Sequence, residues 1–153
     1  MKTAAVQILE RKQLAYTLHE YEEEELSADE AARKLGLPLA RVFKTLVVRG
    51  DRTGVVLACL PGTGALDLKK LARASGNKRA DLVPVEEIHR LTGYLRGGVS
   101  PLGSRKPYPL YLDESALLHD TIGVSAGMRG LELLLAPAAL VAAAHATVLL
   151  LTE

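Results

Sequence analysis

Lys44 is the residue whose type and surroundings most suggest chemistry. It interrupts the apolar run Val42–Val48, where on a strand it would share a face with Val42, Leu46 and Val48. A lysine in such a run either extends its ammonium to solvent at the strand end or places a cation where an anionic or carbonyl oxygen binds. The residue pattern alone favours neither of these two interpretations over the other.

A glycine-rich segment is the second candidate. It reads Gly97-Gly98-Val99-Ser100-Pro101-Leu102-Gly103. Glycines let backbone amides approach a ligand closely, and such amides can stabilise an oxyanion. A tight connector between two elements would have the same composition, so both interpretations stay open. The segment Ser125–Gly127 could make a similar turn, although it is a weaker signal alone.

None of the familiar catalytic motifs occurs in this sequence with the spacing that it requires. The four histidines are scattered, and no pair has the spacing of a metal motif such as H-E-x-x-H. The single cysteine, Cys59, lies in an apolar run and is expected to behave as a small buried hydrophobe. Ser100 misses the G-x-S-x-G elbow because Leu102 stands where the second glycine belongs. We therefore expect no metal, no cofactor and no familiar protein nucleophile.

The composition bounds the class of protein. A chain of 153 residues, 48% hydrophobic and 24% charged, predicts one folded domain over residues 1–153 rather than a disordered chain. One cysteine excludes an internal disulfide and favours the reducing cytoplasm. The longest apolar stretch, Leu133–Leu151, contains Pro137 and His145, so we expect no membrane span. The first residues also lack the apolar core of a signal peptide.

The net charge of +1 conceals a basic centre. Residues 33–106 carry 15 basic and 5 acidic side chains, whereas the segments on both sides are acidic. Such a segment suits a polyanion, because Lys and Arg neutralise phosphates and release counterions. The same residues could instead solvate helix faces and pair with the acidic ends, and charge alone does not choose between the two.

Periodicity and turn signals predict the elements that must position these residues. Ser27 and Glu30 form a capping box before a helix that Gly36 ends, and Gly50–Gly54 joins two β-rich runs. The pattern predicts an α+β fold with a mixed, barrel-like β-sheet flanked by helices. Helices are expected over 3–12, 27–35, 67–74, 84–92 and 138–146, and strands over 15–21, 42–49, 53–60, 109–113, 121–125, 131–136 and 147–151.

Four segments, in this order and at similar spacing, resemble the YbaK family. They are Phe43–Leu46, Leu66–Ala72, Thr92–Gly103 and Ser125–Glu132. Members are free-standing relatives of the editing domain of bacterial prolyl-tRNA synthetase, and the resemblance extends over essentially the whole chain. It implies the fold of that editing domain and hydrolysis of the ester in a mischarged aminoacyl-tRNA.

The resemblance is greatest to the Cys-tRNA(Pro) deacylase branch. It implies that the substrate's own thiol attacks the ester, so that the protein supplies position and charge rather than a nucleophile. Deacylases of Ala-tRNA(Pro) or Ser-tRNA on the same fold are the alternative, since pockets for cysteine and alanine differ by only about 1–3 kcal/mol in binding. A non-catalytic module that binds tRNA or a synthetase is a third.

The resemblance also assigns expected roles to individual residues. Lys44 would lie against the terminal adenosine or the ester carbonyl, and the amides of the loop from Gly97 to Pro101 would face the oxyanion. The expected partner is the acceptor end of tRNA(Pro), reached directly or through prolyl-tRNA synthetase. The expected catalytic residues are Lys44, Gly97, Gly98, Ser100 and Pro101; the substrate-binding residues are Tyr21, Phe43, Thr45, Ser125 and Gly127; and the tRNA-binding residues are Lys69, Lys70, Arg73, Lys78 and Arg79.

Overall fold

Side chains and glycines account for where the helices begin and end. The Ser27 hydroxyl accepts a hydrogen bond from the Glu30 amide at 3.2 Å, and Asp67 caps a later helix in the same way. Gly36 and Gly76 end these two helices with positive φ. In the computed structural model, which describes residues 2–23 and 27–153, the α-helices are α1 (Ala4–Arg11), α2 (Ala28–Leu35), α3 (Leu68–Ser75), α4 (Val85–Thr92) and α5 (Pro137–Ala144).

The strands form two sheets, so the expected α+β fold is present but the sheet is not a closed barrel. The smaller sheet is antiparallel with the order β1-β7-β6, and the larger is mixed with the order β4-β2-β3-β5-β8. An isolated parallel bridge between Val42 and Gly123 links them. The strands are β1 (Thr17–Glu20), β2 (Phe43–Gly50), β3 (Gly54–Pro61), β4 (Ala80–Leu82), β5 (Leu110–Asp113), β6 (Ile122–Met128), β7 (Leu131–Leu135) and β8 (Thr147–Leu149).

Three short elements lie outside the sequence-based expectations. They are β4 and two 3₁₀ helices, η1 (Leu39–Arg41) and η2 (Glu114–Leu118). β4 has three residues, too few to show a period, and it exists because it pairs with the Val48–Gly50 end of β2. A contact made far along the chain therefore decides its structure.

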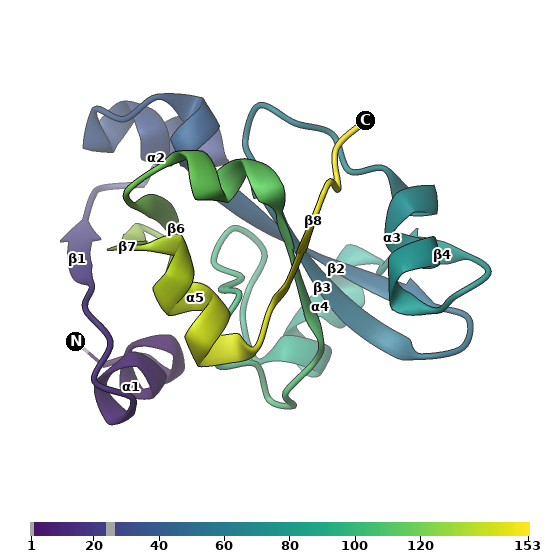
Figure 1. The fold of residues 1–153 in the computed structure, drawn as a ribbon. Helices are drawn as coiled ribbons and strands as arrows, with labels where there is room; N and C mark the ends of the chain where they lie inside the picture. The colour runs from purple at the N-terminus through teal and green to yellow at the C-terminus, as the bar shows by residue number, and fades with distance from the viewer. Residues whose placement is uncertain (1, 24–26) are drawn as a thin grey trace.

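The main core lies where the two sheets face each other. On β7, Leu131, Leu133 and Leu135 point into this core, which also receives Phe43 and Val47 from β2. Because side chains alternate along a strand, Glu132 must face the opposite side of the small sheet. Figure 1 shows α1 and β1 on one side of the molecule and α3 with β4 on the other.

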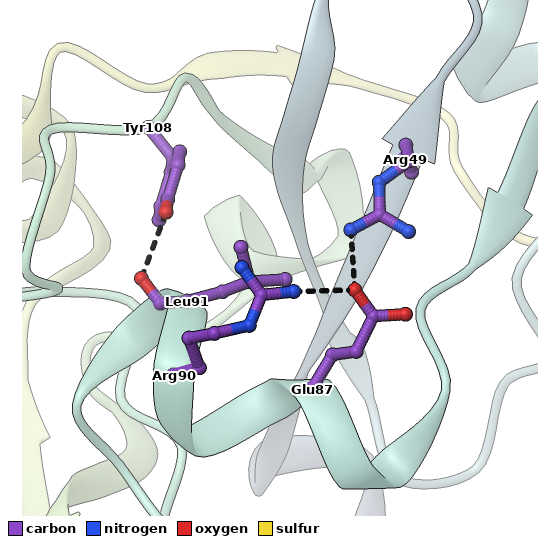
Figure 2. Close-up of polar contacts among 5 residues, drawn as sticks. All are labelled: Arg49, Glu87, Arg90, Leu91 and Tyr108. Atoms are coloured by element: carbon purple, nitrogen blue, oxygen red, sulfur yellow. Dashed lines mark hydrogen bonds and ion pairs between the residues drawn. The ribbon is translucent and has the colours of Figure 1, made fainter.

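Helix α4 is held against the large sheet by polar contacts at its surface. Glu87 on α4 accepts hydrogen bonds from Arg49 on β2 at 2.8 Å and from Arg90 at 2.7 Å (Figure 2). At the end of the same helix the Tyr108 hydroxyl donates to the Leu91 carbonyl at 2.7 Å. The same helix contributes Val85 and Ile88 to the lining of the cavity described next.

Candidate active site

A cavity of about 530 Å³ opens between the start of β2, helices α2 and α4 and the small sheet. This volume lies in the range of small-molecule binding sites. Its wall is largely apolar, with a few charged and polar groups at separate points. The lining residues are Tyr21, Ser27, Ala28, Asp29, Ala31, Val42, Phe43, Lys44, Thr45, Leu46, Val47, Gly62, Leu82, Val83, Val85, Ile88, Arg96, Gly97, Val99, Ser125 and Glu132.

Lys44 is a half-buried cation in this wall. It is the second residue of β2 and pairs with Leu60 of β3. Among residues 2–23 and 27–153, its ammonium makes no hydrogen bond or ion pair. The next residue, Thr45, also lines the cavity, but its hydroxyl is buried beside the thiol of Cys59, its partner in register on β3. The Lys44 ammonium is therefore the group that is available to a ligand.

Glu132 is a second ionisable group of the cavity, and the sequence analysis assigned it no role. It is only 5% exposed, and burial raises the pKa of its carboxyl to about 8. The signal that could have found it is the one that found Lys44, a single charged residue inside an otherwise apolar strand.

The glycine loop divides into a cavity-facing part and a packed part. Gly97, with φ +86°, and Val99 line the cavity, and their amides have no hydrogen-bond partner among the described residues. The Gly98 amide instead donates to the Leu95 carbonyl at 2.8 Å. Ser100 and Pro101 are buried and lie outside the lining, and the Ser100 hydroxyl accepts from the Leu102 amide at 3.3 Å.

Tyr94 explains why glycines are needed behind the loop. Its buried hydroxyl donates to the Leu102 carbonyl at 2.6 Å. A Cβ at Gly103 would come within 2.5 Å of that hydroxyl, and one at Gly127 within 2.7 Å of the ring. Gly127, expected to bind substrate, is thus placed against Tyr94 and outside the cavity lining. A Cβ at Gly98 would meet the backbone between Met128 and Arg129 at 3.1 Å.

The other expected substrate-binding residues do meet at the cavity. Tyr21, Phe43 and Ser125 line it together with Thr45. The Ser125 hydroxyl accepts a hydrogen bond from the Gly127 amide at 3.1 Å, which orients it. Burial, with Glu132 nearby, raises the pKa of the Tyr21 hydroxyl to about 12, so this group is a neutral hydrogen-bond donor.

No cysteine thiolate is available in the cavity. Cys59, the only cysteine, is fully buried, and burial raises the pKa of its thiol to about 12. Among residues 2–23 and 27–153, no group of three or more His, Cys, Asp or Glu side chains is arranged to hold a metal ion. No helix in those ranges is long and apolar enough to cross a bilayer.

The basic residues expected to bind tRNA gather at the opposite end of β2. Its Gly50 end pairs with Ala80, so the neighbouring Lys78 and Arg79 lie about 20 Å along the strand from Lys44. Lys69 and Arg73 on α3 are exposed, whereas the Lys70 ammonium donates to the Thr152 carbonyl at 2.7 Å. The structure thus separates the basic residues from the cavity.

Comparisons with known proteins agree with this architecture. Residues 22–143 match the aminoacyl-tRNA editing domain family. A candidate Cys-tRNA(Pro)/Cys-tRNA(Cys) deacylase, EbsC of Enterococcus faecalis, is 45% identical over 91% of this chain and 86% of its own length. The proline–tRNA ligase of Thermosipho africanus is 31% identical over 52% of this chain and 14% of its own length.

A solved structure gives the same result at the level of the fold. The crystal structure of a candidate trans-editing enzyme for prolyl-tRNA synthetase superposes with a TM-score of 0.87 at 30% identity, covering 100% of this chain and 99% of that one. The similarity therefore includes both sheets and the helices around the cavity. The chain belongs to the aminoacyl-tRNA editing domain family.

Proposed function

We propose that this protein is a deacylase that hydrolyses mischarged Cys-tRNA(Pro) in trans and releases free tRNA(Pro). One observation carries the proposal furthest: Lys44 has no partner among the described residues and lines a cavity that Cys59, the one cysteine of the sequence, does not line. The Cys59 thiol is buried, and burial raises its pKa to about 12. The similarity to EbsC supports the choice of substrate.

The reaction then uses a nucleophile carried by the substrate. The cysteinyl sulfur attacks its own ester carbonyl, a carbon–sulfur bond forms and the bond to the ribose oxygen breaks. The thiol proton ends on that ribose oxygen, so the products are a four-membered thiolactone and tRNA with a free hydroxyl. Lys44 and the amides of Gly97 and Val99 stabilise the oxyanion, because preorganised donors without partners of their own act strongly on developing charge.

Deacylation of Ala-tRNA(Pro) or Ser-tRNA on this scaffold is the second candidate. The hydroxyls of Tyr21 and Ser125, which line the cavity, favour it, since they could position a water molecule or a small polar side chain. Alanine has no thiol, so its hydrolysis requires water as the nucleophile. A module that binds tRNA or synthetase without catalysis would leave Lys44 without a chemical role.

The partners proposed for the reaction are the acceptor end of tRNA(Pro) and, as a recruiting protein, prolyl-tRNA synthetase, with both acting in the cytoplasm. Lys69, Arg73, Lys78 and Arg79 are exposed and lie beyond the cavity, where they could contact the phosphates of the acceptor stem. Copurification with prolyl-tRNA synthetase, with and without tRNA, tests this. A complex of this protein that forms only when both tRNA and prolyl-tRNA synthetase are present supports recruitment through the synthetase.

The decisive experiment measures deacylation of Cys-tRNA(Pro) and Ala-tRNA(Pro) side by side, in the presence of a chelator. Cleavage of the cysteinyl ester alone, with a thiolactone trapped by hydroxylamine, is the expected result. Cleavage of the alanyl ester would replace the thiol mechanism with attack by water. Salt-sensitive tRNA binding without cleavage of either ester would overturn the enzymatic proposal.

A further inference from the structure

Glu132 is an acidic side chain that the fold itself does not need. On β7 its neighbours Leu131 and Leu133 pack into the main core, while Glu132 faces the cavity. Among residues 2–23 and 27–153 its carboxyl has no hydrogen-bond or ion-pair partner. The residue is only 5% exposed to solvent. A Cβ on Gly123 would lie 3.4 Å from Glu132 Oε2, so the carboxyl occupies the space above that glycine.

Keeping such a group costs stability. A carboxylate moved from water into a protein interior loses its hydration, and that loss is offset only when a partner replaces the water. The pKa of about 8 expresses the same cost, because burial disfavours the charged form. Groups kept at the expense of stability in a cavity are candidates for ligand recognition.

Two ionisable side chains that are partly or fully shielded in the cavity wall belong to different sheets. Lys44 lies on β2 of the large sheet, and Glu132 lies on β7 of the small one. Asp29 and Arg96 also line the cavity, but both are exposed. A ligand that carries both a cationic group and an oxygen-rich group is complementary to Lys44 and Glu132. An aminoacyl ester has this form, since its α-ammonium is separated by one carbon from the ester carbonyl and the ribose.

We propose that Glu132 binds the α-ammonium group of the aminoacyl ester and so orients the carbonyl toward Lys44. This inference rests on the proposed function and adds to it the group that reads the amino end of the substrate. On binding, the ammonium supplies the missing partner, so the carboxylate becomes the stable form. Substrates without a free amino group, such as N-blocked peptidyl esters, are then excluded.

The test compares two substrates on two proteins. Cysteinyl-tRNA is paired with 3-mercaptopropionyl-tRNA, which keeps the thiol and the ester but has hydrogen in place of the amino group. For the wild type, kcat/KM should fall by about 30-fold or more on the second substrate, since breaking a buried charge pair has at least that effect. For Glu132→Gln, the two substrates should differ by less than about threefold, because the pair is already lost.

Two controls separate this role from others. Glu86→Gln changes an exposed glutamate on α4 outside the lining and should keep the wild-type preference. Glu132→Asp keeps the negative charge and should also prefer the substrate with the amino group. Equal losses on both substrates in Glu132→Gln would mean that Glu132 acts as a base or a structural residue, and would overturn the inference.

Failure of the proposed function gives a different result. If the wild type cleaves neither substrate, the deacylase proposal fails, and competition binding then tests Glu132 independently. Non-hydrolysable 3′-cysteinylamide adenosine and its desamino analogue should bind the wild type with different affinities and Glu132→Gln with similar ones. Equal binding of the two analogues to the wild type would overturn the inference.

Discussion

Strand β2 carries two kinds of charged residue, and their surroundings differ. Near its end Arg49 donates to Glu87 at 2.8 Å, and Arg90 donates to the same carboxylate oxygen (Figure 2). These groups lie at the surface, and the hydrogen bond from Arg49 keeps the pKa of the Glu87 carboxyl below its usual range. Five residues earlier Lys44 lies half-buried in a cavity with no partner in the described part of the chain.

The comparison distinguishes charges that are paired with each other at the surface from charges that we propose bind a ligand. Exposed ion pairs satisfy each other and contribute little to stability. Lys44 and Glu132, in contrast, line one cavity without pairing in the described part of the chain, and we propose that each gains its partner from a substrate. The predictions below test this distinction, beginning with the largest effect.

Removal of Lys44 should have the largest effect on activity. Lys44→Ala is expected to lower kcat for Cys-tRNA(Pro) deacylation by about 100-fold or more, because an oxyanion donor contributes on that scale. Single-turnover deacylation measures the loss. Lys12→Ala, at the exposed end of α1, is the matched control and should retain full activity. Full turnover by Lys44→Ala would remove this lysine from the mechanism.

Replacement of Glu132 should raise stability at alkaline pH. Its folded-state pKa of about 8 lies above the usual value of 4.5, so the folded protein holds a proton that the unfolded chain releases between these pH values. The wild type must therefore lose stability as pH rises through this range, whereas Glu132→Gln must not. At pH 9 the variant should be more stable by about 1–3 kcal/mol.

Urea unfolding of both proteins at pH 4.5 and pH 9 measures this difference. The ionisable groups near Glu132 come from several elements. They are His19 in register on β1, Tyr21, Cys59, Glu30 on α2, and the cavity-lining Asp29, Lys44 and Arg96. They are common to both proteins, so their contributions cancel in the comparison. A variant less stable than the wild type at both pH values would show that Glu132 holds the fold together.

The basic residues beyond the cavity should affect tRNA binding rather than chemistry. In Lys69→Ala/Arg73→Ala, the slope of log affinity for tRNA against log salt should decrease by about 1.4–1.8, because two phosphate contacts are lost. Deacylation of a short aminoacylated acceptor-end RNA should be unchanged. An unchanged slope for full-length tRNA would place the contact surface elsewhere.

The smallest effect is expected for the paired charges on β2 and α4. Arg49→Ala removes an exposed ion pair, so the midpoint of thermal unfolding and the rate of deacylation should both stay close to wild type. Differential scanning calorimetry and the deacylation assay measure the two quantities. A loss of activity as large as that of Lys44→Ala would abolish the distinction between paired and unpaired charges.

Local patterns predicted most of the elements and part of the cavity. The caps at Ser27 and Asp67 and the turn at Gly50–Gly54 depend on only a few neighbouring residues. The two helices and the hairpin that they delimit could therefore be predicted from the sequence. β4 could not be predicted from the sequence, because its structure depends on pairing with β2. The predicted α+β class with a mixed sheet is confirmed, but the division of the strands into two sheets could not be predicted, since it depends on how distant strands pair.

The sequence by itself determined the family, the α+β class and the position of Lys44 in an apolar strand, because motifs, caps and periodicity are properties of neighbouring residues. Only the tertiary structure decided which groups share the cavity. It placed Gly97 and Val99 in the wall but gave the Gly98 amide to Leu95. It also brought Glu132 and Lys44 to the same cavity, since the two lie on separate sheets whose packing depends on contacts between segments far apart along the chain.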